Sequence, residues 1–238
     1  MDRRSNNIAI FQDSMDLIKA NQKLQQAVQF SIQNQKLYVP SQAIALPEPG
    51  KSSCKTIVSS KRSFEAASAY AKSGKRVCVL NFASATNPGG GVTRGSTAQE
   101  ECLCMDSTLY PVLNSFRGAY YEPNKKLLNR ALYTDRALYT PDVVFENDEC
   151  TVKADIITCA APNKYAAQKY QKVSDEENEK VLINRLLFIR DIVADQGVDT
   201  LILGAFGCGV FGQDPRQVAE LMDEIFGVAS VENIVYAV

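Results

Sequence analysis

Three consecutive glycines and a pair of glutamates are the residues of this chain best suited to chemistry. The glycines are Gly89, Gly90 and Gly91, and seven residues later come Gln99, Glu100 and Glu101. Glycines let backbone N–H groups approach a ligand closely, and the N-terminus of a following helix adds unpaired donors, so an anionic group binds well there. Two glutamates beside such a loop favour acid–base chemistry on a phosphorylated substrate.

The absence of histidine gives the glutamates further weight. The chain contains none, which excludes Ser-His and Cys-His nucleophile pairs and histidine metal ligands. Acid–base work near neutral pH then falls mainly to carboxylates with a raised pKa, or to Lys, Tyr or Cys.

A capping box is the ordinary alternative for Glu100. Thr97-Ala98-Gln99-Glu100 matches the T-x-x-E pattern and predicts a helix from there toward Asn114. That pattern explains neither the adjoining glycines nor the second glutamate, so we favour the chemical interpretation.

A second glycine-rich segment follows an apolar run near the C-terminus. It consists of Gly207, Cys208, Gly209, Val210, Phe211 and Gly212. Its backbone N–H groups could wrap a diphosphate, whereas the alternative is a tight turn from strand to helix. Cys208 lacks a histidine partner, so we interpret it as a packed thiol rather than a nucleophile.

The periodicity and cap signals predict alternating helices and strands. Helices are expected at residues 8–20, 63–73, 97–114, 174–197 and 214–227, and strands at 55–59, 77–83, 143–145, 154–160, 200–204 and 233–238. Residues 37–53, with three prolines, are expected to form a loop. Strands that alternate with helices predict an α/β sandwich, in which ligands bind beyond the carboxyl ends of the strands. Both glycine loops fall there.

The composition limits the possible classes of protein. The 238 residues suit one core rather than two, and 26 basic against 27 acidic residues leave no positive field that would gather nucleic acid. No segment has the apolar length of a membrane span or signal peptide, so we expect a cytoplasmic protein. Seven cysteines without a C-x-x-C pair indicate neither disulfides nor a zinc site. We expect no metal and no cofactor.

The block from Asn81 to Tyr110, with G-G-G, seven residues and Q-E-E, resembles the signature of bacterial-type poly(ADP-ribose) glycohydrolases. Residues 157–163 and 203–212 support this resemblance, which extends from about Arg62 to Ala229. It implies a macrodomain-like three-layer α/β/α sandwich with a central mixed sheet. We expect residues 1–60 to form a helical and loop extension packed on a catalytic domain of residues 61–238, and the protein to be a monomer.

The resemblance also implies roles for the site residues. Glu101 corresponds to the catalytic acid that cleaves the ribose–ribose bonds of poly(ADP-ribose), and Glu100 binds ribose hydroxyls, with Gln99 beside it. Residues 207–212 become the diphosphate loop, and Phe211 either stacks on adenosine or belongs to the core. Asn87 either forms a turn with Pro88 or hydrogen-bonds a ribose hydroxyl. Two alternatives stay open: a hydrolase of mono-ADP-ribose on protein or nucleic acid, and a reader that binds ADP-ribose without cleaving it.

Overall fold

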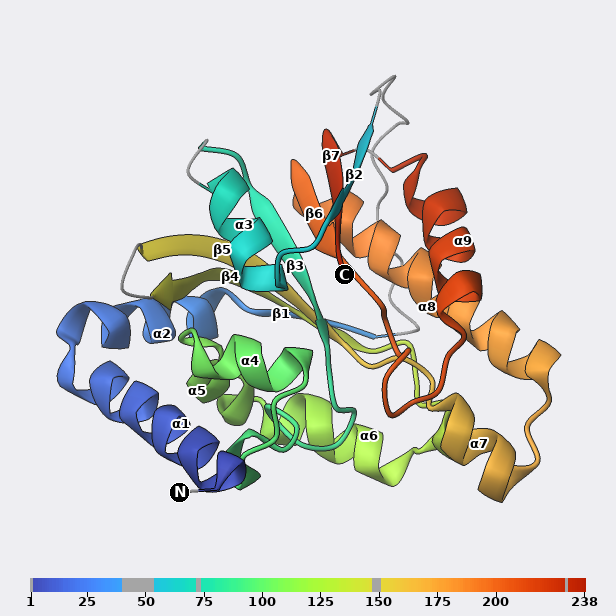
Figure 1. Ribbon diagram of the computed structural model, residues 1–238, viewed down its shortest axis with the longest axis horizontal. Helices are drawn as coiled ribbons and strands as arrows, with labels where there is room; N and C mark the ends of the chain where they lie inside the picture. The colour runs from blue at the N-terminus through green and yellow to red at the C-terminus, as the bar shows by residue number, and fades with distance from the viewer. Residues whose placement is uncertain (1, 40–53, 72–73, 147–150, 230) are drawn as a thin grey trace.

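A single seven-stranded sheet organises the molecule (Figure 1). The computed structural model describes residues 2–39, 54–71, 74–146, 151–229 and 231–238. The strands in chain order are β1 (Lys36–Tyr38), β2 (Lys55–Ser59), β3 (Val77–Phe82), β4 (Ala137–Glu146), β5 (Thr151–Cys159), β6 (Thr200–Leu203) and β7 (Asn233–Ala237).

The sheet is mixed, as predicted. Its order is β1-β4-β5-β3-β6-β7-β2; the strands from β5 to β2 run parallel, and β4 and β1 are antiparallel to their neighbours. The central parallel strands β3 and β6 are apolar on both faces because helices cover both. Their carboxyl ends meet at one edge, where both glycine loops begin.

Helices cover both faces of the sheet. They are α1 (Arg3–Ala20), α2 (Gln22–Asn34), α3 (Ser63–Ala71), α4 (Gln99–Met105), α5 (Leu109–Ser115), α6 (Glu122–Lys126), α7 (Lys164–Gln171), α8 (Asp175–Gln196) and α9 (Pro215–Phe226). The shorter turns are η1 (Val92–Arg94), η2 (Arg117–Tyr121) and η3 (Asn129–Ala131). None of the helices in the described ranges combines the length and apolar composition that a membrane crossing requires.

The core has one part on each face because side chains alternate along the strands. In β3, Cys78 and Leu80 pack with α8 and α9, whereas Val77 and Val79 pack with α1, α3, α4 and α5. The sheet with its two helical layers confirms the predicted α/β sandwich.

Local cap signals predicted several helix boundaries correctly. Ser174 caps α8 by accepting a hydrogen bond from the Glu177 N–H, and Asp214 caps α9 by accepting from Arg216 and Gln217. Gly197 ends α8 in the left-handed region, with φ of 61°.

The predicted helix from Thr97 to Asn114 is wrong. Two shorter helices, α4 and α5, replace it, and Ala98 occupies the N-cap of α4 without a side-chain bond. The capping box does not form because the Glu100 carboxylate bonds to the distant Ser84 N–H instead.

Several other elements differ from the prediction. Helices α2, α6 and α7 were not predicted, β4 is longer than residues 143–145, and β1 occupies the start of the segment expected to be a loop. The rest of that segment, 40–53, lies outside the described residues, as do residues 72–73 of the predicted helix at 63–73.

Candidate active site

Strand β3 ends in a buried polar side chain that supports the first glutamate. Asn81 is fully buried; its Nδ2 lies 3.2 Å from Thr158 Oγ1 on β5 and 3.5 Å from Glu100 Oε1. Its Oδ1 has no partner among the described protein atoms. The sequence analysis missed Asn81, although a polar residue within the apolar run 77–83 was a usable signal.

Gln99 attaches helix α4 to the same strand. Its Oε1 accepts a hydrogen bond from the Phe82 N–H at 2.9 Å, and its Nε2 donates to the Leu80 carbonyl at 2.8 Å. The Gln99 amide therefore pairs with the backbone of β3 much as a neighbouring strand would. Since both ends of the amide are engaged, its evident role is to position the two glutamates that follow it.

The glycine turn passes closely over both carboxylates. Gly90 has φ of 58°, and a β-carbon placed on it would lie 2.6 Å from Glu101 Oε1 and 3.0 Å from Glu100 Oε2. The Gly91 N–H donates to Glu101 Oε1 at 2.9 Å. Gly89 also has a positive φ, of 65°, so the turn needs glycine both for its backbone conformation and for its clearance.

Both glutamates are buried, with 3% of Glu100 and 7% of Glu101 exposed. Burial, and to a smaller extent the neighbouring Glu101, raise the pKa of Glu100 to about 8, although the hydrogen bond from the Ser84 N–H opposes the rise. That bond is 2.7 Å long. The buried pair therefore favours retention of a proton near neutral pH.

The second glycine loop lies across a cavity from the start of α4. The cavity has a volume of about 260 Å³, and it is lined by Gln99 and Ala98 on one side and by Gly207, Gly209, Val210 and Phe211 on the other. Gly207 has φ of 78° and fits between Ala161 and Gln213, where a β-carbon would be 2.8 Å from Ala161 Cβ. Segments remote in sequence are thus brought together, as predicted.

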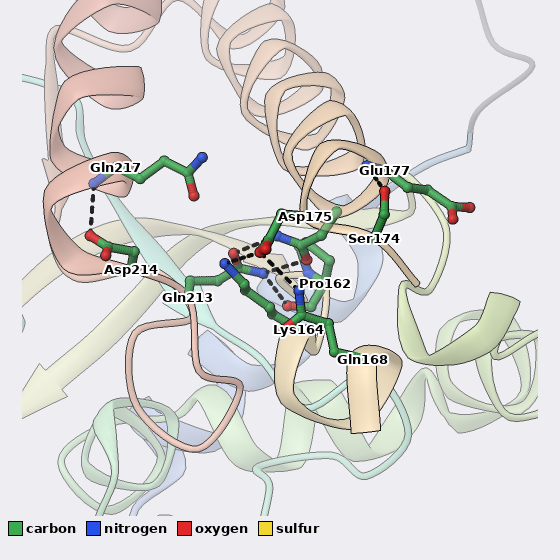
Figure 2. Close-up of polar contacts among 10 residues, drawn as sticks. Pro162, Lys164, Gln168, Ser174, Asp175, Glu177, Gln213, Asp214 and Gln217 are labelled. Atoms are coloured by element: carbon green, nitrogen blue, oxygen red, sulfur yellow. Dashed lines mark hydrogen bonds and ion pairs between the residues drawn. The ribbon is translucent and has the colours of Figure 1, made fainter. Parts of the chain in front are cut away.

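A buried polar network holds the second loop (Figure 2). Gln213 Nε2 donates to the Pro162 carbonyl at 2.8 Å, and the Gln213 and Asn178 amides exchange two hydrogen bonds. Gln213 thereby ties residues 207–212 to the start of α7 and to α8.

Of the remaining predicted residues, Phe211 lines the cavity, whereas Cys208 and Asn87 do not. The Phe211 ring is tilted against Tyr133, with centroids 6.0 Å apart. Cys208 is partly buried, and burial raises its pKa to about 11, which disfavours the thiolate that a nucleophile requires. Asn87 is exposed, and its backbone carbonyl accepts from the Gly90 N–H at 3.0 Å, so it forms the turn.

A second cavity, of about 330 Å³, adjoins the first and shares Phe82, Ala98, Gln99 and Ala205 with it. It extends toward Ser60 and Arg62 at the end of β2 and toward Val238 after β7. Together the two cavities form a cleft along the carboxyl edge of the sheet, long enough for an extended ligand. Within the described ranges, no three His, Cys, Asp or Glu side chains are grouped so that they could hold a metal ion.

Comparison with known proteins identifies the family. A family model described as the catalytic domain of microbial-type PARG matches residues 8–148. The chain belongs to the microbial-type PARG family. PARG denotes poly(ADP-ribose) glycohydrolase, a glycosidase. The match begins within α1, in the region where the resemblance of the sequence was less distinct.

Solved PARG structures share the fold over nearly the whole chain. Poly(ADP-ribose) glycohydrolase from Thermomonospora curvata, bound to the inhibitor ADP-HPD, is 29% identical; the alignment covers 99% of this chain and 94% of that one, with a TM-score of 0.88. The enzyme from Deinococcus radiodurans, in complex with ADP-ribose, is 33% identical over 88% and 89% of the two chains, with a TM-score of 0.81. No curated protein sequence matches the chain.

Proposed function

We propose that this PARG-family chain hydrolyses the ribose–ribose O-glycosidic bonds of poly(ADP-ribose) and releases ADP-ribose, with Glu101 as general acid. The observation that carries the proposal is the buried carboxylate pair directly beneath the Gly89–Gly91 turn. The structures of the Thermomonospora and Deinococcus enzymes, solved with ADP-HPD and ADP-ribose, support the same substrate class.

The chemistry follows from what bond cleavage requires. As the bond at C1″ of the ribose breaks, the departing oxygen needs a proton and the ribose develops oxocarbenium character. Glu101, held by the Gly91 N–H, delivers the proton that the pair holds to the departing oxygen and then, as a carboxylate, stabilises the cation. Water then bonds to C1″ and gives up a proton to Glu101, which restores the acid. Glu100, fixed by Ser84 and Asn81, orients the ribose hydroxyls.

The rest of the ligand follows the cleft. The backbone N–H groups of residues 207–212 receive the diphosphate, and Phe211 packs on the ribose or adenosine beside it. The adjoining cavity, next to Ser60 and Arg62, accommodates the adenosine. One chain supplies every residue of this proposed site, so a monomer suffices for activity.

Release of ADP-ribose from poly(ADP-ribose), measured by chromatography, tests the proposal. We expect Glu101→Gln to bind ADP-ribose as the wild type does, yet to lose turnover by about a thousandfold or more, because both the proton and the charge are removed. Glu224→Gln, an exposed carboxylate on α9, is the matched control and should retain full activity. Turnover retained in Glu101→Gln would refute the assignment.

The same assay separates the alternatives. A wild-type protein that binds ADP-ribose and cleaves only mono-ADP-ribosylated protein or nucleic acid would be a mono-ADP-ribosyl hydrolase. Binding without product from any of these substrates would indicate a reader.

A further inference from the structure

Two exposed tyrosines and a lysine form a compact surface on α7. Tyr165 is 55% exposed and Tyr170 is 64% exposed. Between them lies Lys169, whose Nζ is 5.0 Å from the centroid of the Tyr165 ring and 5.3 Å from that of Tyr170. Lys169 Nζ also donates to the Tyr165 hydroxyl at 2.8 Å. We call these three residues the α7 aromatic surface.

This surface carries positive charge without an acidic counterpart. Lys164, at the start of the same helix, pairs with Asp175 at 2.7 Å. By contrast, none of the ion pairs within the described part of the chain includes Lys169 or the nearby Lys172. Exposed rings interleaved with free cations are the combination that binds single-stranded nucleotide polymers, because bases stack on the rings and phosphates pair with the cations.

The surface is continuous with the proposed diphosphate loop. The Tyr165 N–H donates to the Phe211 carbonyl at 3.0 Å, and a β-carbon placed on Gly212 would be 3.2 Å from Tyr165 Cβ. The start of α7 is fixed on that loop by the hydrogen bond from Gln213 to Pro162 (Figure 2). A ligand that leaves the cleft past Phe211 therefore meets α7 as a rigid neighbour.

The order of the strands gives the direction in which the polymer leaves. The proposed adenosine cavity lies at the ends of β2 and β7, and the diphosphate cavity lies between the ends of β3 and β6. Glu100 lies over Asn81, which pairs with Thr158 of β5. We therefore expect the leaving group, which is the rest of the polymer, to lie beyond the glutamates on the side of β5. Strand β5 is the strand that leads into α7 (Figure 1).

We propose that the α7 aromatic surface, together with Lys172, binds the part of poly(ADP-ribose) that lies beyond the scissile bond. Adenine rings of the retained chain stack on Tyr165 and Tyr170, and its diphosphates pair with Lys169 and Lys172. This inference rests on the proposed function. It assigns to the protein a preference for long polymer over short fragments.

Binding of long poly(ADP-ribose) to the inactive Glu101→Gln protein tests the surface without cleavage. In that background, Tyr165→Ala with Tyr170→Ala should weaken polymer binding about tenfold, given the usual contribution of base stacking. Alanine keeps the backbone N–H and the Cβ of Tyr165 that contact the loop. Lys169→Gln with Lys172→Gln should lower the slope of log Kd against log salt by about 1. Binding of free ADP-ribose, measured by calorimetry, should stay unchanged in both.

A matched control and two further arms make the outcome decisive. Phe30→Ala with Lys23→Gln removes an exposed ring and a cation from α2, far from the cleft, and should leave polymer binding unchanged. Unchanged polymer binding in the α7 variants, or an equal loss of ADP-ribose binding, would overturn the proposal. Equal competition by poly(dA) with poly(ADP-ribose) at the same residues would also overturn the proposal, because the surface would then be a general nucleic-acid site. A wild-type protein that releases no ADP-ribose would refute the proposed function, whereas the binding arms test the surface separately.

Discussion

At the residue scale, the two adjacent glutamates differ in their surroundings. Glu100 is fixed at the end of β3 by the Ser84 N–H and the Asn81 amide, whereas Glu101 is held by the Gly91 N–H in the glycine turn. Adjacent carboxyls in different environments can divide the work of proton transfer and substrate orientation.

The raised pKa of Glu100 predicts a dependence of stability on pH. Its pKa is about 8 in the folded protein, against an ordinary 4.5, so the folded state binds this proton more tightly. The resulting stability is fully present below about pH 4.5 and is lost as the pH rises through 8. Relative to wild type, Glu100→Gln should therefore gain unfolding free energy, on the order of a few kcal/mol, between pH 5 and 9.

Denaturant unfolding at a series of pH values measures this difference. The exposed Glu224→Gln variant serves as the reference, because its unfolding free energy should run parallel to that of the wild type across the range. If Glu100→Gln also ran parallel to the wild type, Glu100 would not hold its proton at neutral pH.

Gly90→Ala should abolish most of the activity. The added methyl group would lie 2.6 Å from Glu101 Oε1 and would force the positive φ of 58° onto a residue with a β-carbon. We expect turnover on poly(ADP-ribose) to fall at least about a hundredfold, because displacing a catalytic group by about 1 Å costs that much. Gly118→Ala is the control, since nothing lies within 4 Å of its added carbon; similar losses in both variants would contradict the argument.

At the scale of elements, α1 supports the segment between the glycines and the glutamates. Asn7 Nδ2 donates to the Gly95 carbonyl at 2.9 Å, and the Phe11 ring packs edge-on against Tyr110 at 4.9 Å. Tyr110 in turn lies against Gly89, where an added β-carbon would be 2.8 Å away. The N-terminal helix thus contacts the segment that follows the glycine turn and, through Tyr110, supports the turn itself.

Asn7 lies outside the cleft, yet Asn7→Ala should lower the activity because of these contacts. Loss of the bond to Gly95 is expected to cost about 1 kcal/mol of stability and to reduce kcat several-fold, because residues 92–98 lose an anchor. Asn6→Ala removes a neighbouring, exposed asparagine and should change neither quantity. Equal kcat values for the two variants would show that α1 does not support the site.

The elements that were predicted correctly are those whose sequence signals lie within a few residues of one another. Ser174 and Asp214 cap helices through residues two or three positions away, and the alternation in β3 is visible within six residues. The break between α4 and α5 was missed because the Glu100 carboxylate binds Ser84, sixteen positions earlier. Glutamine-rich α2 was missed although its buried residues, Leu24, Val28 and Ser31, recur at helical spacing and mark a face.

At the scale of the whole molecule, the sheet order determines the cleft. Residues near 60, 82, 99, 161, 205 and 238 line one continuous groove only because β2, β7, β6, β3 and β5 end side by side. The sequence predicted that ligands bind beyond the strand ends, but the order of the strands is a property of pairings between distant segments. The cavity proposed to hold adenosine and the α7 aromatic surface could be recognised only in the structure.

The hydrogen bonds of Gln99 change how the Q-E-E signature is understood. Its first residue belongs to the architecture of the sheet, since the amide replaces a strand partner for Leu80 and Phe82, whereas the next two residues meet the glycine turn. A glutamate at position 99 would turn an acceptor toward the Leu80 carbonyl, so the two residue types are not interchangeable there. Anyone who transplants the proposed catalytic pair onto another protein must therefore transplant the unpaired end of a strand with it.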